Sequence, residues 1–210
     1  MFLKKMELGS LKANCYIIAN SDTKYAAIID PGDAIDKIIN TIEENNLKVK
    51  YIILTHGHCD HIGAAEELKN ITNAPIYVHK NDLALLEDKN KNYSAMIGRK
   101  VVEFSTDNFL EDGDILKLGN LKLEILHTPG HTQGGICIYV DDIVFTGDTL
   151  FANSIGRTDF VGGDYNQIID SINTKLMVLS DYVRVLPGHG PESNIGVERS
   201  TNPFINKKYI

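Results

Sequence analysis

Four ligand-type side chains lie within six positions, in the stretch Thr-His-Gly-His-Cys-Asp-His at residues 55–61. They are His56, His58, Asp60 and His61. Imidazole nitrogens and carboxylate oxygens are the ligands that zinc and similar divalent cations take in proteins. Such a cluster is costly to place unless a cation binds it, and four ligands in one turn are difficult to aim at a single ion. The stretch therefore predicts a metal site that two ions share.

Three further candidate ligands follow apolar, strand-like runs elsewhere in the chain. His131, Asp148 and His189 stand in the segments His-Thr-Pro-Gly-His-Thr, Phe-Thr-Gly-Asp-Thr and Leu-Pro-Gly-His-Gly. The run 51–54 leads into His56 in the same way. Sheets of α/β proteins place their sites at the carboxyl ends of strands. We therefore expect these three residues to meet the loop 55–61.

Short strands and amphipathic helices must position these residues. Strand-length apolar runs occur at Cys15–Ala19, Tyr25–Ile29, Val49–Leu54, Ile76–Val78, Leu121–Leu126, Ile136–Val140, Ile143–Phe145 and Val183–Leu186. Helical spacing of apolar residues predicts helices at 35–42 behind an Asp33 cap, from about His61 to Ile71, and at 165–179. Asn120 and Asp141-Asp142 predict hairpin turns, and hence antiparallel pairs. The polar segment 81–113 is expected to be a surface excursion.

Composition restricts the class of protein. The 210 residues, 43% hydrophobic and 23% charged, suit one globular domain. A net charge of −7 argues against a nucleic-acid or anionic-membrane partner, which would need a basic patch. Three widely spaced cysteines form no Cys-x-x-Cys pair, and the sequence has neither a signal peptide nor an apolar run of membrane-spanning length. We expect a soluble protein of the cytoplasm.

The order of the four ligand motifs resembles that of the metallo-β-lactamase superfamily. Within it the chain is similar to glyoxalase II (hydroxyacylglutathione hydrolase) and its short bacterial relatives. Further matching segments are Asn14-Cys15-Tyr16, Ile29-Asp30-Pro31-Gly32, Ser154-Ile155-Gly156-Arg157-Thr158-Asp159 and Glu198-Arg199…Asn202-Pro203-Phe204. The resemblance extends over most of the chain.

The resemblance implies a fold and a ligand set. The fold is a four-layer αββα sandwich, in which two mixed sheets are flanked by helices, forming a single domain over residues 1–210. With 21 residues after His189, the C-terminal helical glutathione-binding domain of glyoxalase II proper is expected to be absent. The implied ligands are His56, His58 and His131 for one ion, Asp60, His61 and His189 for the other, and Asp148 as the bridge. The cofactors would be two divalent ions, zinc before iron or manganese.

The resemblance also implies a reaction. Water between two divalent ions loses its proton near neutral pH and attacks a carbonyl carbon. The small-molecule substrate would be a thioester, S-D-lactoylglutathione or a related acyl-thiol, as in methylglyoxal detoxification. Asp60 and Asp148 are the expected catalytic residues, with Asp60 orienting the nucleophile or handling its proton. Arg157 is assigned either to a substrate carboxylate or to an ion pair with Asp159.

Other functions and ligands remain open from the sequence. One alternative is a persulfide dioxygenase with a single iron at His56, His131 and Asp148, and others are a lactonase, a β-lactamase or a phosphodiesterase. A purely structural metal module is the non-enzymatic alternative, although such sites are usually closed and four-coordinate. His127, His79 and Cys59 are expected to lie outside the ligand set. Asp30 is expected to support the site or fix its loop. The sequence indicates no oligomeric state.

Overall fold

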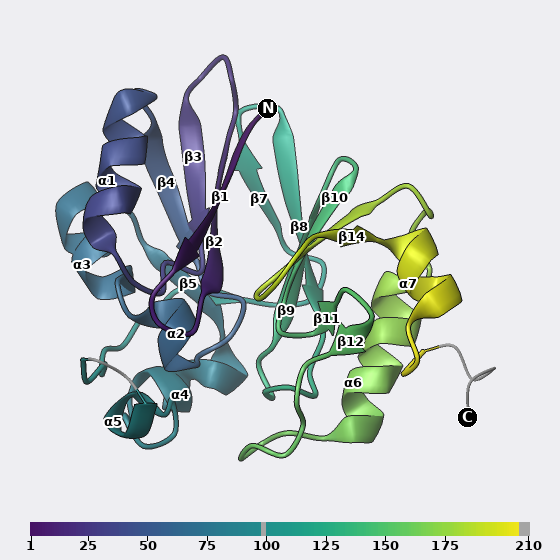
Figure 1. Cartoon of the computed structure of the whole chain (residues 1–210). Coiled ribbons are helices and arrows are strands. Elements are labelled where there is room, and N and C mark those ends of the chain that lie inside the picture. Colours follow the sequence, from purple (N-terminus) through teal and green to yellow (C-terminus); the bar gives the residue numbers. More distant parts are fainter. Residues whose placement is uncertain (98–99, 206–210) are drawn as a thin grey trace.

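Two six-stranded sheets pack face to face, and helices cover their outer faces (Figure 1). This computed structural model describes residues 1–97 and 100–205. Helices α1 and α3 lie outside one sheet, and α6 and α7 lie outside the other. Both sheets contain parallel and antiparallel pairs. The expected four-layer αββα sandwich with two mixed sheets is therefore confirmed.

The bounds of the elements follow the chain. The first sheet, in spatial order, contains β1 (Phe2–Leu8), β2 (Ala13–Ala19), β3 (Tyr25–Ile29), β4 (Lys48–Ile53), β5 (Ile76–His79) and β6 (Phe109–Leu110). The second contains β14 (Ser193–Asn194), β13 (Arg184–Pro187), β10 (Ile143–Gly147), β9 (Ile136–Val140), β8 (Leu121–His127) and β7 (Ile115–Leu118). A small hairpin joins β11 (Leu150–Phe151) to β12 (Ser154–Ile155).

The helices are short. They are α1 (Ile35–Glu44), α2 (Cys59–Ile62), α3 (Ala65–Thr72), the 3₁₀ turn η1 (Lys80–Asp82), α4 (Leu83–Leu86), α5 (Ser94–Ile97), α6 (Tyr165–Ser171), the π-helical turn η2 (Ile172–Leu176) and α7 (Ile195–Thr201). None of these described helices has the length and apolar character needed to cross a lipid bilayer.

Alternation along β2 shows how the layers form. Tyr16 and Ile18 pack between the two sheets, whereas Cys15, Ile17 and Ala19 pack against the outer helices. Successive side chains of a strand point to opposite faces, so a strand covered on both sides must be apolar throughout. This explains why β2 reads as one continuous apolar run.

All three expected helices differ in their details. A side-chain cap by Asp33 is wrong, because Ala34 precedes α1 with a φ of 50° and the Asp33 carboxylate accepts only the N–H of Ala34. The helix expected from His61 is divided into α2 and α3. The helix expected at 165–179 passes into the π-helical turn at Ile172 and stops at Leu176, so its last three predicted residues lie outside it.

The hairpins are confirmed, and several strands were missed. Asn120 lies in the turn of the antiparallel pair β7–β8, and Asp141-Asp142 forms the turn of β9–β10. Strand β1 was missed because it is only partly buried and has Lys4 and Lys5 on opposite faces, which hides the apolar alternation. The sheet nevertheless pairs β1 with β2 over its whole length.

The segment 81–113 is not simply a surface excursion. It contributes α4, α5 and β6, and it buries the polar side chains of Asp82 and Asn92 completely. Leu86 enters the core behind the first sheet. Residues 98–99 of this segment lie outside the described residues. The prediction failed because buried polar side chains that bind backbone groups look like surface residues in a sequence.

Candidate metal centre

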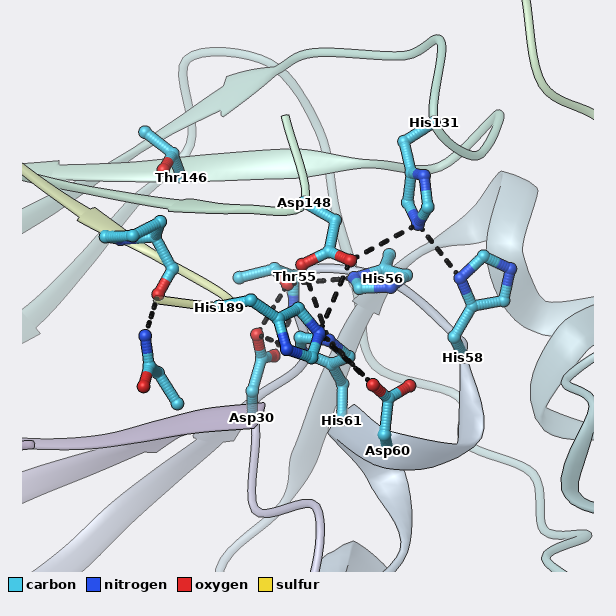
Figure 2. A network of polar contacts seen from close by, with 12 residues as sticks. Asp30, Thr55, His56, His58, Asp60, His61, His131, Thr146, Asp148 and His189 are labelled. Carbon is cyan, nitrogen blue, oxygen red and sulfur yellow. Dashed lines mark hydrogen bonds and ion pairs between the residues drawn. The ribbon is translucent and has the colours of Figure 1, made fainter. Parts of the chain in front are cut away.

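The side chains predicted to be ligands all converge at one end of the two sheets (Figure 2). His56 follows β4, and His58, Asp60 and His61 occupy the next turn and α2. The other three, His131, Asp148 and His189, follow β8, β10 and β13 of the second sheet. The structure therefore brings the predicted residues together, whereas their assignment as metal ligands stays a prediction.

His56, His58 and His131 form the first group. One ring nitrogen from each lies within 4.8 Å of the others, and all three side chains are buried. The His58 Nδ1 and His131 Nε2 atoms are 3.0 Å apart. The Nε2 atom of His56 is buried without a hydrogen-bond partner among the described residues. Three nitrogens thus converge on one point.

Asp60, His61 and His189 form the second group. The Nε2 atoms of His61 and His189 are 3.3 Å apart. Asp60 Oδ2 lies 3.2 Å from the Nε2 of His189 and 3.7 Å from that of His61. This group therefore contains two nitrogens and one carboxylate, while the first contains nitrogens alone.

Asp148 lies between the two groups. Its Oδ1 atom is 3.5 Å from His61 Nε2, and its Oδ2 atom is 3.7 Å from His131 Nε2 and 3.6 Å from His189 Nε2. Figure 2 shows the carboxylate directed at both groups. Oδ1 is buried and has no hydrogen bond to any described residue. One carboxylate therefore contacts both sets of nitrogens.

The donor set fits divalent cations. Neutral imidazoles whose nitrogens face each other at 3.0–3.3 Å direct lone pairs at the same space unless a proton or a cation lies between them. Buried acceptors without a partner are unfavourable, by about 1–3 kcal/mol each. Nitrogen and carboxylate ligands in these numbers suit zinc, iron and manganese. The two clusters are thus consistent with a dinuclear metal site.

Hydrogen bonds fix which nitrogen of His56 faces the cluster. Asp30 accepts the backbone N–H of Thr55 at 2.7 Å and its hydroxyl at 2.6 Å. Because the Thr55 hydroxyl donates to Asp30, its oxygen is free to accept from the Nδ1 of His56, 3.1 Å away. The Nε2 atom of His56 then presents its lone pair to the cluster. Second partners of this kind orient metal-binding histidines in many proteins.

The same logic applies to two other histidines. His61 Nδ1 is 3.0 Å from Asp30 Oδ2, and His131 Nδ1 is 2.7 Å from the backbone oxygen of Arg157. Both Nδ1 atoms donate, so both Nε2 atoms face the cluster and can bind a cation once they carry no proton. The expectation that Asp30 supports the site is confirmed. Although Asp30, His56 and His61 also lie close enough to form a group, Asp30 contacts the outward nitrogen of His61.

The two groups differ in charge. Burial lowers the pKa of His58 to about 3, with further lowering by His131, and burial lowers that of His56 well below its usual value. Burial also acts to lower the pKa of His61, but the Asp60, Asp148 and Asp30 carboxylates outweigh it and raise this pKa to about 10. His56 and His58 are therefore neutral at neutral pH, whereas His61 lies in a strongly negative field.

Asp82 ties the two ligand-bearing loops together, and the sequence analysis missed it. Its carboxylate accepts the N–H of Gly57 at 2.9 Å, the hydroxyl of Thr132 at 2.8 Å and the N–H of Gly134 at 2.7 Å. Gly57 lies in the first ligand loop, and the other two partners follow His131. The one feature of the sequence that pointed to this place was the predicted strand that ends at His79, three residues before Asp82.

The first sheet anchors the loop that carries His189. Asn14 on β2 donates its side-chain N–H to the backbone oxygens of Pro187 and Gly190, at 2.8 and 3.0 Å. The Tyr16 hydroxyl donates to the oxygen of Pro187 at 2.8 Å. At position 188, a Cβ atom would lie 2.2 Å from the carboxylate of Asp148, so only glycine fits.

The remaining predicted residues lie as follows. His127 stacks on His79 with 3.9 Å between ring centroids, and neither belongs to a described ligand group, as expected. Cys59 is also outside these groups. Arg157 forms a two-point ion pair with Asp159, at 2.8 and 2.7 Å, and packs over the ring of Phe160. Its contact with a substrate carboxylate stays a prediction.

A cavity of about 350 Å³ opens onto both groups. Its metal side is formed by His58, Asp60, His131, Asp148 and His189. This volume lies at the small end of the range for ligand pockets. A substrate in the cavity would therefore lie directly against the candidate metal centre.

Comparisons with known proteins agree with this site. The model of the metallo-beta-lactamase superfamily matches residues 8–189. Hydroxyacylglutathione hydrolase GloC of Haemophilus influenzae is 41% identical, covering 99% of this chain and 100% of its own length. The crystal structure of BLEG-1 B3 metallo-beta-lactamase is 35% identical with a TM-score of 0.92, covering 98% of this chain and all of that one.

A second solved structure is also similar over nearly the whole chain. TTHA1623 in a di-iron-bound form is 34% identical with a TM-score of 0.84, covering 96% of this chain and 99% of that chain. A full-length likeness of this kind agrees with the pair of ligand groups found here. The family match and the histidine-rich site identify a metal-dependent hydrolase, and the chain belongs to the metallo-beta-lactamase superfamily.

Proposed function

We propose that this protein hydrolyses thioesters with two divalent metal ions, zinc by preference. In this proposal His56, His58 and His131 bind one ion, Asp60, His61 and His189 bind the other, and Asp148 binds both. The two ions supply a hydroxide at neutral pH and polarise the carbonyl group. The substrate is a small molecule, and the acidic chain argues against nucleic acid as a ligand.

The position of Asp148 is the observation that carries the proposal. Its two oxygens lie 3.5–3.7 Å from nitrogens of both groups. A single ion held by His56, His131 and Asp148 would leave the Asp60 carboxylate and the facing nitrogens of the second group without a cation. The dinuclear hydrolase therefore explains more of the buried polar atoms than a one-iron dioxygenase does.

The residues on the cavity also suit a thioester. Among the described residues that line it, Asp60 and Asp148 are the only carboxylates, and both contact histidines of the two groups. The pKa of Asp60 is lowered because the effect of His61 and His189 outweighs that of its burial, so it stays ionised. In that state Asp60 can orient an attacking water. Asp60 therefore cannot donate a proton to a poor leaving group, whereas a thiolate leaves without one.

The thiol carrier is proposed from a relative. The 41% identity to a hydroxyacylglutathione hydrolase over the whole chain supports S-D-lactoylglutathione or a related acyl-thiol as substrate. Three buried cysteines without disulfides support work in a reducing compartment, as in the cytoplasm.

One preparation assayed three ways tests this function. The protein is loaded with zinc, freed of excess metal, and given S-D-lactoylglutathione, a persulfide with oxygen-uptake recording, and a β-lactam. We expect thioester hydrolysis to exceed the other two activities by at least about 100-fold in kcat/KM, which is a difference of about 2.7 kcal/mol in transition-state binding. Oxygen uptake with one bound iron would replace the proposal by the dioxygenase. β-Lactam turnover in the absence of thioester turnover would also contradict it.

A further inference from the structure

Part of the cavity lining is apolar or aromatic. Leu11, Tyr93, Ile97, Phe151 and Phe160 form this part, which we call the apolar wall. They come from the turn between β1 and β2, from the segment around α5, and from the chain that follows β10. Segments far apart in the sequence thus contribute apolar side chains to one surface beside the metal centre.

Part of this apolar wall is left open to solvent. Leu11 is 45% exposed and Ile97 is 54% exposed. A single exposed apolar residue is ordinary, but apolar residues gathered at a concave site indicate a surface that binds something. Burying these two side chains under a ligand would be favourable through the hydrophobic effect.

The aromatic part of the wall is held in a fixed position. The Tyr93 ring lies 4.8 Å from that of Phe160 and 5.5 Å from that of His58, between centroids. The Tyr93 hydroxyl accepts the N–H of Val161 at 3.4 Å. Tyr93 also has a φ of 66°, an unfavourable value for a bulky residue that often marks functional sites.

Asn92 keeps Tyr93 in this conformation. Its amide donates to the backbone oxygens of Leu85 and Val102, at 2.9 and 2.8 Å, and its backbone oxygen accepts the N–H of Cys59 at 2.9 Å. Cys59 lies inside the first ligand loop. The apolar wall is therefore fastened to the same loop that carries His58 and Asp60.

The polar side chains on this side already have partners. The Asn92 oxygen accepts the N–H of Ser94 at 2.9 Å, and Arg157 directs two guanidinium nitrogens at Asp159. A site built to recognise a substrate hydroxyl presents a polar group to it, because an unmatched buried hydroxyl is unfavourable. Apart from the Tyr93 hydroxyl, the wall offers apolar contact in place of hydrogen bonds.

We propose that this wall binds an apolar acyl group, so that the preferred thioesters carry an aliphatic chain or an aromatic ring next to the carbonyl. The inference rests on the proposed thioester hydrolysis. The carbonyl lies at the metal centre, and the acyl chain packs on Ile97, Leu11 and the Tyr93–Phe160 pair. A short, hydroxylated acyl group such as lactoyl is then hydrolysed more slowly than these, although it remains a substrate.

An acyl series on one small thiol tests the inference. Zinc-loaded full-length protein is assayed with lactoyl, acetyl, butyryl and hexanoyl thioesters of N-acetylcysteamine, so that the thiol contributes equally to each. We expect kcat/KM to rise about threefold for each added methylene that the wall covers. A lactoyl thioester that is hydrolysed as fast as the hexanoyl thioester, or faster, would overturn the apolar wall.

Binding separates this inference from the proposed function. The hexyl and methyl thioethers of N-acetylcysteamine cannot be hydrolysed, and calorimetry measures their Kd. We expect the hexyl compound to bind at least about tenfold more tightly. If no thioester is hydrolysed but this difference is found, the hydrolysis proposal fails and the apolar wall stands. Equal affinities would refute the wall even in an active thioesterase.

Two neighbouring residues supply a matched pair of variants. Ile97→Ser should reduce the ratio of hexanoyl to acetyl kcat/KM by about fivefold, since a covered apolar side chain is lost. Met96→Ser is the control, because Met96 is 75% exposed and does not line the cavity. Leu11→Ser should act like Ile97→Ser. An equal effect of the Met96 and Ile97 variants would contradict the inference.

Discussion

The two walls of the cavity beside the metal centre differ in composition, in burial and in how they are held. The metal wall belongs to a centre of seven histidines and aspartates, four of which (His56, His58, His61 and His131) are buried. Asp30, Thr55 and the backbone oxygen of Arg157 accept hydrogen bonds that orient His61, His56 and His131. The other wall consists of Leu11, Ile97 and aromatic rings and is partly exposed. Chemistry requires fixed atoms on one side, whereas substrate choice requires only a surface of the right polarity on the other. Under the two proposals above, reaction type and specificity would reside in separate parts of this fold.

The largest expected effect comes from removing the Asp148 carboxylate from the metal wall. Asp148→Ala removes the one carboxylate that contacts both groups, and metal-assisted stabilisation is worth several kcal/mol. We expect kcat to fall at least about 1,000-fold. Steady-state kinetics with bound zinc counted in parallel is the measurement. Asp142→Ala, on the exposed β9–β10 turn, is the control and should retain full activity. An active Asp148→Ala enzyme would show that the carboxylate is dispensable.

The second prediction concerns Asp30, which supports the candidate ligands from outside the ligand groups. Asp30→Asn disturbs two contacts, one to Thr55, which orients His56, and one to His61 itself. Loss of such a supporting contact usually reduces metal affinity by about 10–100-fold. Competition with a coloured chelator measures this affinity. Asp33→Asn, an exposed carboxylate near α1, should leave it unchanged. Equal affinities of the Asp30 variant and the parent would refute the orienting role.

The third prediction concerns the tie between the two ligand loops. Asp82→Ala leaves the N–H groups of Gly57 and Gly134 and the Thr132 hydroxyl without their acceptor. Unsatisfied buried donors should lower the free energy of unfolding by about 3 kcal/mol. Urea denaturation of the metal-free protein gives this number. The exposed Asp107 in the same segment provides the control Asp107→Ala, which should change stability by less than about 0.5 kcal/mol. Matching effects of both substitutions would show that Asp82 is not a tie.

Metal affinity at the two ligand groups should depend differently on pH. Because the pKa of His61 is raised to about 10 without metal, this residue is protonated at neutral pH and must lose its proton when an ion binds. Affinity at the second group should therefore rise about tenfold per pH unit between pH 7 and 9, and level off above 10. His56 and His58 have lowered pKa values and are already neutral, so they contribute no such slope. Calorimetric metal titrations at several pH values check this, and equal slopes for the two ions would contradict it.

The smallest effect is expected for Arg157, which also lines the cavity. Arg157→Ala should raise KM about fivefold for a thioester whose thiol carries a carboxylate, through loss of a charged contact. Asp159→Ala is the matched variant, since it leaves the guanidinium free, and it should not raise KM. Both should change stability by less than about 1 kcal/mol, because this ion pair is largely exposed. Equal increases in KM would assign Arg157 to loop fixing alone.

The sequence predicted the metal wall and not the apolar one, for physical reasons. His131, Asp148 and His189 each follow a buried strand, and the carboxyl ends of such strands meet at one edge, so their meeting with His56 could be anticipated. Leu11, Ile97 and Phe160 have no shared period, and any of them could be a core residue. Only the folded chain places them on one surface.

The polar residues of the segment 81–113 led to the opposite error, because they were predicted to lie on the surface. Asp82 and Asn92 are fully buried, yet polar residues at such positions usually lie on the surface. Their partners are backbone groups, which carry no sequence signature. The predicted Asp33 cap was wrong for another reason: Ala34 adopts the left-handed conformation, which directs the chain away from a side-chain cap.

Anomalous X-ray diffraction from zinc-loaded crystals would locate the bound ions. We expect two peaks per chain, one among His56, His58 and His131 and one among Asp60, His61 and His189, with Asp148 in contact with both. A single peak at the first group, with His61 and His189 left without metal at saturating zinc, would refute the dinuclear site.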